Sequence, residues 1–257
     1  MKKIFIALLF VVAMLSVSLF AQTNIVNVVS DLTNSTEGNL NKAISNVLTA
    51  DPTGAQLSNT VFKLEAYGYY ILTGTITTPR GSHLYLQGPT PGATQQTAPP
   101  QIAWSNSGGV TTTFSFDCGG DFTANNIWFL SARSSGAQVG SSIVFEDDSL
   151  ANLSGKGENA WFDGCIFDYN NIGNGGGCIE PACRHFRGHI TNSYFRNMAD
   201  PHYRYYGRPI SYTYQSTTWH TDTLILENCT VANVGYVLMQ ESPEYGDYIA
   251  FNHCTFV

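Results

Sequence analysis

The sequence predicts an all-β solenoid, a stack of coils built from short strands, with one short helix in front of it. Three observations lead to this fold class: a low density of charge, a short phrase that recurs in the second half of the chain, and apolar residues that alternate within each copy. Of the 257 residues, 43% are hydrophobic and only 12% are charged, against about 25% charged in an average domain. The aromatic content of 13% excludes a disordered chain.

The charge balance excludes one class of partner. The chain carries 12 basic and 19 acidic residues, a net charge of −7. A nucleic-acid-binding protein needs a basic face that neutralises phosphates. We therefore expect no nucleic acid among its partners.

Residues 1–21 predict an export signal. Two lysines precede the apolar run Ile4–Val17, and either Ser16–Ser18 or Leu19–Ala21 supplies a cleavage site. The run is short for an anchor, and no later stretch reaches the roughly 20 apolar residues of a membrane span. We expect a secreted protein, extracellular or at the cell surface, with no membrane span once the signal is removed.

Residues 22–59 predict an N-terminal segment with a capping helix. Thr36 is the expected N-cap, Glu37 follows in the first turn, and Pro52 lies beyond the helix end. Five apolar residues fall on one helix face: Leu40, Ala43, Ile44, Val47 and Leu48. Such a helix would cover the edges of the first coil, which a solenoid otherwise exposes.

A repeated phrase organises the second half of the chain. Its copies are Asn125–Trp128 (the weakest), Trp161–Phe167, Ile190–Phe195, Leu226–Val231 and Phe251–Phe256. We align them on one small residue, the anchor: Asn126, Cys165, Ser193, Cys229 and Cys254. The resulting spacings of 39, 28, 36 and 25 residues are typical of a solenoid with loop insertions of variable length.

The columns of this alignment predict two short strands joined by a bend. Apolar residues stand three places before the anchor: Phe162, Ile190, Leu226 and Phe251. Others stand two places after it: Trp128, Phe167, Phe195, Val231 and Phe256. This period of two points alternate side chains to one interior. The place before the anchor holds residues that tolerate a left-handed backbone: Asn125, Gly164, Asn192, Asn228 and His253. Asparagines stacked there could hydrogen-bond along the solenoid.

The six cysteines divide into two groups. Cys165, Cys229 and Cys254 occupy the anchor column, so we expect a file of buried free thiols rather than disulfides. Cys178 and Cys183 lie in an insertion of an exported chain, where a disulfide is permitted. Free thiols, or a zinc site with His185 and His189, remain alternatives for this pair.

The phrase and its spacing resemble the right-handed parallel β-helix of the pectin-lyase-like superfamily, over about residues 60–257. The segments Gly68–Leu72, Gly74–Thr77 and Leu84–Gly88 look like the opening coil of such proteins. The resemblance implies a β-helix domain over 60–257, similar to secreted proteins of environmental bacteria. Because the last copy stops at Val257 without a polar cap, we expect this domain to be incomplete at its C-terminus. The same coil supports lyases, hydrolases, epimerases, adhesins and stalks.

The insertion at residues 196–220 is the candidate site. Aromatic faces stack on sugar rings and arginines bind carboxylates, so we expect substrate binding by Arg196, Tyr203, Tyr205, Tyr212, Tyr214 and Trp219. The candidate catalytic residues are His202, Arg204, Tyr206 and Arg208. Arg204 or Arg208 would neutralise a uronate carboxylate, while His202 or Tyr206 would remove the adjacent proton. Alternatively, this is a surface loop whose tyrosines pack on the coil and whose arginines pair with Asp200 and Asp222.

Calcium is a possible cofactor, since it takes oxygen ligands. The candidate ligands are Asp117, Asp121, Glu146, Asp147, Asp148, Asp163 and Asp168, and surface solvation is the alternative. If calcium binds, it would bridge to substrate carboxylates, as in pectate-lyase-like enzymes. Apart from the alternative zinc site at Cys178 and Cys183, no other cofactor or metal site is expected.

Two functions follow from these observations. The first is a monomeric, secreted protein that binds or acts on extracellular polysaccharide, with lyase-like β-elimination on an acidic glycan if it is an enzyme. The motifs of the polygalacturonase-type hydrolases are absent, which makes a carboxylate-pair hydrolase less favoured than a lyase. The second is a non-catalytic surface or adhesion solenoid that binds glycan or serves as a stalk; the acidic net charge favours it slightly, because it repels a polyanion.

Overall fold

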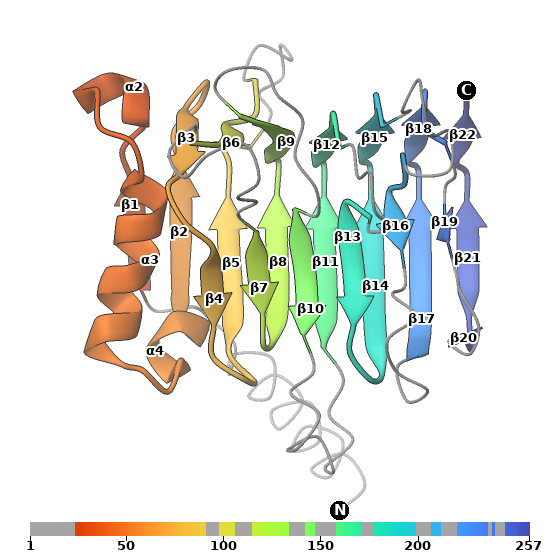
Figure 1. The fold of residues 1–257 in the computed structure, drawn as a ribbon, viewed down its shortest axis with the longest axis horizontal. Coiled ribbons are helices and arrows are strands. Elements are labelled where there is room, and N and C mark those ends of the chain that lie inside the picture. Colours follow the sequence, from red (N-terminus) through yellow and green to blue (C-terminus); the bar gives the residue numbers. More distant parts are fainter. Residues whose placement is uncertain are drawn as a thin grey trace, which may run out of the picture.

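The computed structural model of the chain describes residues 24–90, 98–105, 115–133, 142–146, 158–170, 177–198, 207–211, 220–235, 238–239 and 245–257. Its strands follow one another through three parallel sheets, so that each coil adds a strand to each sheet in turn (Figure 1). The chain is a parallel β-solenoid. The predicted fold class is confirmed.

The three sheets run along the length of the solenoid (Figure 1). The nine-stranded sheet contains β1 (Asn24–Val28), β2 (Thr60–Leu64), β5 (His83–Gln87), β8 (Asp121–Asn125), β11 (Asn159–Asp163), β14 (Phe186–Thr191), β17 (His220–Glu227), β20 (Tyr245–Gly246) and β21 (Ile249–Asn252). The seven-stranded sheet contains β3 (Tyr69–Leu72), β6 (Gln101–Trp104), β9 (Trp128–Arg133), β12 (Ile166–Asp168), β15 (Tyr194–Arg196), β18 (Thr230–Ala232) and β22 (Thr255–Phe256). The six-stranded sheet contains β4 (Ile76–Thr78), β7 (Phe116–Cys118), β10 (Ile143–Glu146), β13 (Ile179–Ala182), β16 (Ile210–Ser211) and β19 (Leu238–Met239).

The solenoid begins before residue 60, where the resemblance placed its start. β1 pairs in parallel with β2, from Asn24 opposite Thr60 to Val28 opposite Leu64. The helices α2 (Asp31–Asn34), α3 (Asn39–Ala50) and α4 (Ala55–Ser58) therefore connect two neighbouring strands of one sheet. No helix among the described residues is long and apolar enough to cross a membrane.

The capping helix is α3, and it buries Leu40, Ile44 and Val47 as its apolar spacing predicts. The predicted N-cap, Thr36, is wrong: the helix begins after Gly38, which takes a left-handed backbone (φ 88°). A buried carboxylate explains the change. Asp31 accepts hydrogen bonds from the backbone N–H groups of Gly38 (3.2 Å), Asn39 (3.1 Å) and, on β3, Ile71 (2.6 Å). One side chain thus ties the helix start to the edge of the seven-stranded sheet.

From β8 onward, each coil turns from the nine-stranded to the seven-stranded sheet through a single left-handed residue. The bend residues are Asn126, Gly164, Asn192, Asn228 and His253, with φ between 51° and 63°. Four of these are the predicted ones. In the first copy the alignment is off by one residue, since strand pairing sets Asn125 beside Asp163 as the last residue of β8. Asn126 therefore makes the bend, and Ile127 takes the inward anchor position.

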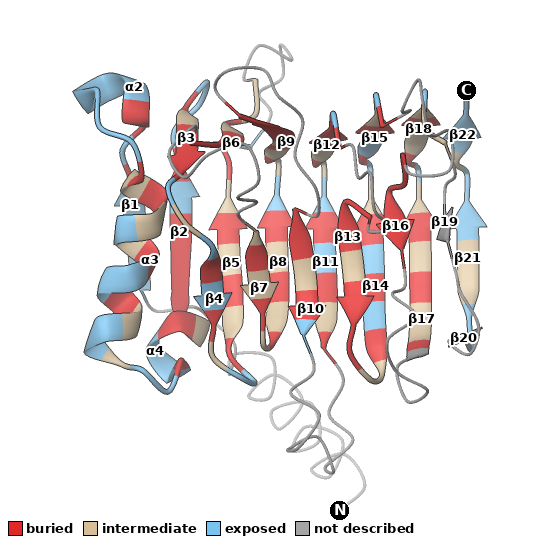
Figure 2. Ribbon diagram, in the orientation of Figure 1, coloured by how far each residue is buried: buried red, intermediate tan, exposed pale blue. Residues whose placement is uncertain are grey.

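The interior of the solenoid is a continuous apolar core (Figure 2). Its clearest feature is a stack of three phenylalanine rings from neighbouring coils, Phe129, Phe167 and Phe195, with centroids 5.2 and 4.7 Å apart. Because of the shifted register, Phe129 rather than Trp128 joins this stack. In the last coil the equivalent Phe256 is 51% exposed, since it packs on one neighbouring coil only.

All six cysteines lie among the described residues and are free thiols, five of them buried. The predicted file of Cys165, Cys229 and Cys254 is confirmed, although Cys254 is only partly buried. Cys178 and Cys183 are buried as well, and no disulfide joins them. Burial raises the pKa of Cys165 and of Cys178 to about 12. These thiols are therefore protonated and packed as small apolar groups.

Candidate functional site

Most of the predicted site lies outside the described residues, namely His202, Tyr203, Arg204, Tyr205, Tyr206, Tyr212, Tyr214 and Trp219. Two of its arginines are described. Arg208 is 2% exposed, and its Nη1 donates a hydrogen bond to Ser211 Oγ (3.1 Å). A guanidinium so enclosed does not face a polymer at the surface. Its role as the charge-neutralising group stays a prediction.

Arg196 holds neighbouring coils together. Its Nη2 lies 2.9 Å from Oδ2 of the buried Asp168 on the adjacent strand β12. The guanidinium also lies 5.0 Å from the centroid of the Trp128 ring on β9. The arginine thus forms an ion pair with Asp168, and this pairing gives it a structural role. Of the two partners expected for the arginines of this insertion, Asp222 pairs with Arg187, and Asp200 lies outside the described residues.

The outward side of the nine-stranded sheet carries the chemistry that the described residues bring together. Along β5, β8 and β11 every second residue is buried, and the residues between them point outward. Parallel register aligns these outward residues across the strands. One line, the aromatic row, contains Tyr85, Thr123, Trp161, His189 and Ile225. A second line, the bend row, contains Gln87, Asn125, Asp163, Thr191 and Glu227.

Three rings gather where the aromatic row crosses β5 and β11. His83 stacks on Tyr85 (centroids 3.6 Å apart) and lies 5.5 Å from Trp161, which is 40% exposed. His83 Nε2 is 2.8 Å from Thr123 Oγ1. Burial lowers the pKa of His83 to about 4, so the ring is neutral near pH 7. The cluster offers a flat apolar surface with polar edges.

Asp121 lies beside this cluster, directly opposite His83 in the parallel register. Its Oδ1 accepts hydrogen bonds from the backbone N–H and the side-chain amide of Asn159, both at 2.8 Å. Burial raises the pKa of Asp121 even though these bonds favour the charged form. The two hydrogen bonds hold the Asp121 carboxylate in place at the edge of the ring cluster.

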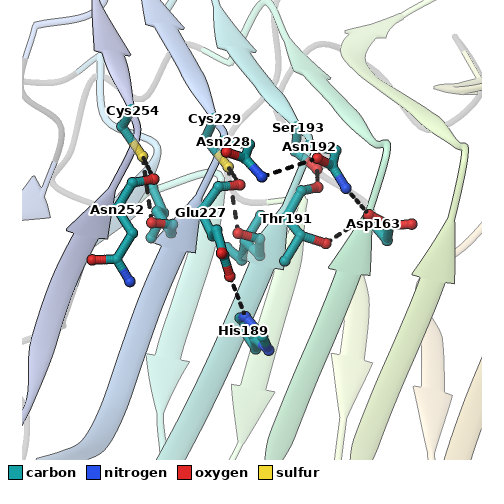
Figure 3. A network of polar contacts seen from close by, with 12 residues as sticks. Asp163, His189, Thr191, Asn192, Ser193, Glu227, Asn228, Cys229, Asn252 and Cys254 are labelled. Carbon is teal, nitrogen blue, oxygen red and sulfur yellow. Dashed lines mark hydrogen bonds and ion pairs between the residues drawn. The ribbon is translucent and has the colours of Figure 1, made fainter.

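Carboxylates contact the basic side chains further along the face. Arg187 Nη2 lies 2.8 Å from Asp222 Oδ2, and His185 Nδ1 lies 3.0 Å from Asp222 Oδ1. Burial opposes ionisation of Asp222, but these two partners outweigh it and lower the pKa of Asp222. His189 Nε2 is 3.6 Å from Glu227 Oε2 (Figure 3). The positive charge of Arg187 is therefore already balanced.

The bend row ends in a hydrogen-bonded ladder of polar side chains (Figure 3). Thr191 Oγ1 and Asn192 Nδ2 both donate to Asp163 Oδ1, at 2.6 and 2.7 Å. Asn228 Nδ2 in turn donates to Asn192 Oδ1 at 3.5 Å. The expected bonding between stacked asparagines is confirmed, and it holds the Asp163 carboxylate in a set orientation.

The described candidate calcium ligands do not form a metal-binding group. Asp117, Asp121, Glu146, Asp163 and Asp168 lie on five different strands, and Asp147 and Asp148 fall outside the described residues. Within the described ranges, no three His, Cys, Asp or Glu side chains form a group suited to a metal ion. The alternative zinc set around Cys178 and Cys183 is thus not assembled there, and calcium binding stays a prediction.

No family model matches the chain, and no curated protein matches it either. The three parallel sheets therefore identify the architecture without a family. The sequence analysis placed the candidate site in an insertion between coils and did not identify the outer face of the nine-stranded sheet. A signal was present, since His83, Tyr85, Asp121, Thr123 and Trp161 alternate with buried residues in the strands.

Proposed function

We propose that this chain is a secreted, carbohydrate-binding β-solenoid of the pectin-lyase-like type, which holds a polysaccharide on the outer face of its nine-stranded sheet. The observation that carries this proposal is the exposed ring of Trp161, which lies 5.5 Å from the ring of His83, itself stacked on Tyr85. Aromatic side chains that gather on one exposed face, together with a few polar groups, are typical of ligand-binding surfaces.

The chemistry of the face suits a sugar polymer. Sugar rings have apolar faces, which stack on aromatic side chains, and hydroxyl edges, which hydrogen-bond to carboxylates and amides. Trp161 supplies the first kind of contact, and Asp163 and Asn125 of the bend row supply the second. Strands in a sheet lie about 4.8 Å apart, so the three spacings from β5 to β14 span roughly 14 Å. A polymer lying across the strands would contact several residues at once.

The charges on this face favour a neutral glycan over an acidic one. Its carboxylates are Asp121, Asp163, Asp222 and Glu227, and its permanent cations are Arg187 and Lys63. Arg187 already pairs with Asp222, so a polyanion would meet uncompensated negative charge. These observations support binding without cleavage. Lyase-like β-elimination on an acidic glycan rests on His202, Arg204 and Tyr206, and it stays a separate prediction.

Glycan binding by two matched variants tests the proposal. Trp161→Ala should weaken binding to neutral polysaccharides by roughly tenfold or more, because burying a large side chain contributes about 1.5–3 kcal/mol. The control is Tyr194→Ala, which removes a ring that is 50% exposed on β15 of the seven-stranded sheet. Affinity electrophoresis over a panel of neutral and uronate polysaccharides measures both. Unchanged binding by Trp161→Ala, or an equal loss in both variants, would overturn the proposal.

A second assay tests β-elimination. The full secreted protein is incubated with uronate polysaccharides, with and without calcium, and the ultraviolet absorbance of unsaturated uronides is followed. A rise would establish lyase activity. A flat trace together with retained glycan binding would leave the non-catalytic form of the proposal.

A further inference from the structure

An open cleft of about 480 Å³ lies where the strands β5, β8 and β11 reach their bends. Ligand sites commonly measure about 300–1,000 Å³. The last residues of the three strands, Gln87, Asn125 and Asp163, line one side, and the segment from Gly88 to Thr90 lines the other. Gly164 and the neighbouring bend residues complete it. The cleft adjoins the aromatic row, since Trp161 and Asp163 are two residues apart on β11.

A missing side chain opens this cleft. The bends of the neighbouring coils carry Asn126 and Asn192, and between them stands Gly164, with a φ of 63°. A Cβ built on Gly164 would meet nothing closer than the backbone of Asn126, at 3.9 Å. The ladder of bend asparagines is therefore interrupted at one step, and the gap belongs to the cleft.

The opposite wall is held in place by two contacts with the bend at Asn126. Asn126 Nδ2 donates a hydrogen bond to the backbone carbonyl of Pro89. Gly88 also approaches closely, because a Cβ at that position would fall 2.1 Å from the carbonyl oxygen of Asn126. Only glycine fits there. The segment from Gly88 to Thr90 therefore packs directly against the bend at Asn126.

The polar groups of the cleft are ready for an uncharged ligand with several hydroxyls. Asp163 receives its two hydrogen bonds from described residues on Oδ1, which leaves Oδ2 to accept from a hydroxyl donor. Among the described residues, the carboxamides of Gln87 and Asn125 make no hydrogen bond; each can both donate and accept. The carboxylate of Asp163 is the only charged side chain among the lining residues, and Lys63 stands one strand further out, on β2.

We propose that the Gly164 cleft is a subsite that binds one neutral sugar residue of the glycan held on the sheet face. This inference rests on the proposed function and adds to it a preference for neutral over acidic sugars. The fixed carboxylate and the two free carboxamides match the donor and acceptor edges of neighbouring sugar hydroxyls. A uronate carboxylate in the cleft would face Asp163 at close range, and like charges repel.

The test fills the gap without straining the chain. Asn tolerates the left-handed backbone that position 164 needs, and three of the other bends already carry it. Gly164→Asn should therefore fold as the wild type does and bind neutral polysaccharide at least tenfold more weakly. The matched control is Gly81→Asn, at another left-handed glycine (φ 68°) with open space around it and no contact with the cleft. Isothermal titration and circular dichroism are measured on the full chain.

The outcomes separate this inference from the proposed function. Loss of binding in Gly164→Asn and Trp161→Ala, but not in Gly81→Asn, supports both. Loss in Trp161→Ala alone overturns the subsite and leaves the sheet-face proposal standing. If Gly164→Asn melts at a lower temperature, Asn125→Ala replaces it, because that exposed amide makes no hydrogen bond to any described residue. Wild-type affinity in Asn125→Ala then overturns the subsite.

A charge variant should increase binding of an acidic glycan, whereas the variants above should weaken binding. Asp163→Asn keeps the shape of the side chain and removes its charge, so it should bind uronate polysaccharide more strongly relative to neutral polysaccharide than the wild type does. An unchanged ratio between the two affinities would contradict the assignment of Asp163 as the group that selects against acidic sugars.

Discussion

The inward and outward sides of the nine-stranded sheet differ in how tightly their side chains are packed. On the inward side of β8 and β11, Phe122 and Phe162 are buried, and their rings meet edge to face at 5.4 Å. On the outward side of the same strands, Thr123 and Trp161 stand in register and stay accessible. Inward residues pack against the next coil, so the fold constrains them. Outward residues are free to serve recognition, and this is why the candidate site lies there.

The largest expected effect is on the inward side. Phe167→Ala removes a fully buried ring held between Phe129 and Phe195, and it should lower the free energy of unfolding by about 3–5 kcal/mol. Phe256→Ala removes the equivalent ring of the last coil, which is 51% exposed, and should cost less than about half as much. Urea denaturation of both variants gives the comparison. Equal losses of unfolding free energy in the two variants would contradict the packing described for the phenylalanine stack.

A smaller effect is expected at His83, an outward side chain that is partly enclosed by its neighbours. Burial lowers the pKa of His83 to about 4, whereas an exposed histidine titrates near 6.5. Between these values the unfolded chain binds a proton that the folded chain does not, so stability falls as the pH drops from about 6.5 to about 4. The stability of His83→Gln should fall less steeply over this range in urea titrations. Parallel curves for variant and wild type would contradict this.

The smallest effect on stability is expected at Trp161. Its ring is 40% exposed and rests on the surface of the sheet, so Trp161→Ala should change the free energy of unfolding by less than about 1 kcal/mol. The same variant should lose glycan binding. A large loss of stability would instead assign this ring to packing and remove the contrast between the two sides.

Much of the fold could be predicted because its signals are local. The bend residues Gly164, Asn192 and Asn228 can be recognised in the sequence because glycine and asparagine tolerate a left-handed backbone. The same tolerance caused the error in the first copy, where Asn125 and Asn126 are equally suited and only strand pairing decides between them. The start of α3 was also predicted wrongly. The carboxylate that accepts from the backbone at the helix start is Asp31, which lies outside the helix and also accepts from the backbone of β3.

The candidate site could not be predicted in the same way. His83, Asp121 and Trp161 lie on three strands about 40 residues apart in the chain, with nothing in the local sequence to join them. They meet because parallel register sets β5, β8 and β11 side by side. The Gly164 cleft likewise depends on which side chains flank the glycine in the coils before and after it.

Short-range chemistry therefore determined the coil: alternating apolar residues make its strands, and glycine or asparagine makes its bends. Stacking of the coils decided the rest. It set the register of the first bend, placed the thiols of Cys178 and Cys183 inside, and gathered His83, Tyr85 and Trp161 on one face. The physical reason is that backbone preferences act within a few residues, whereas the neighbours of an outward side chain come from other coils.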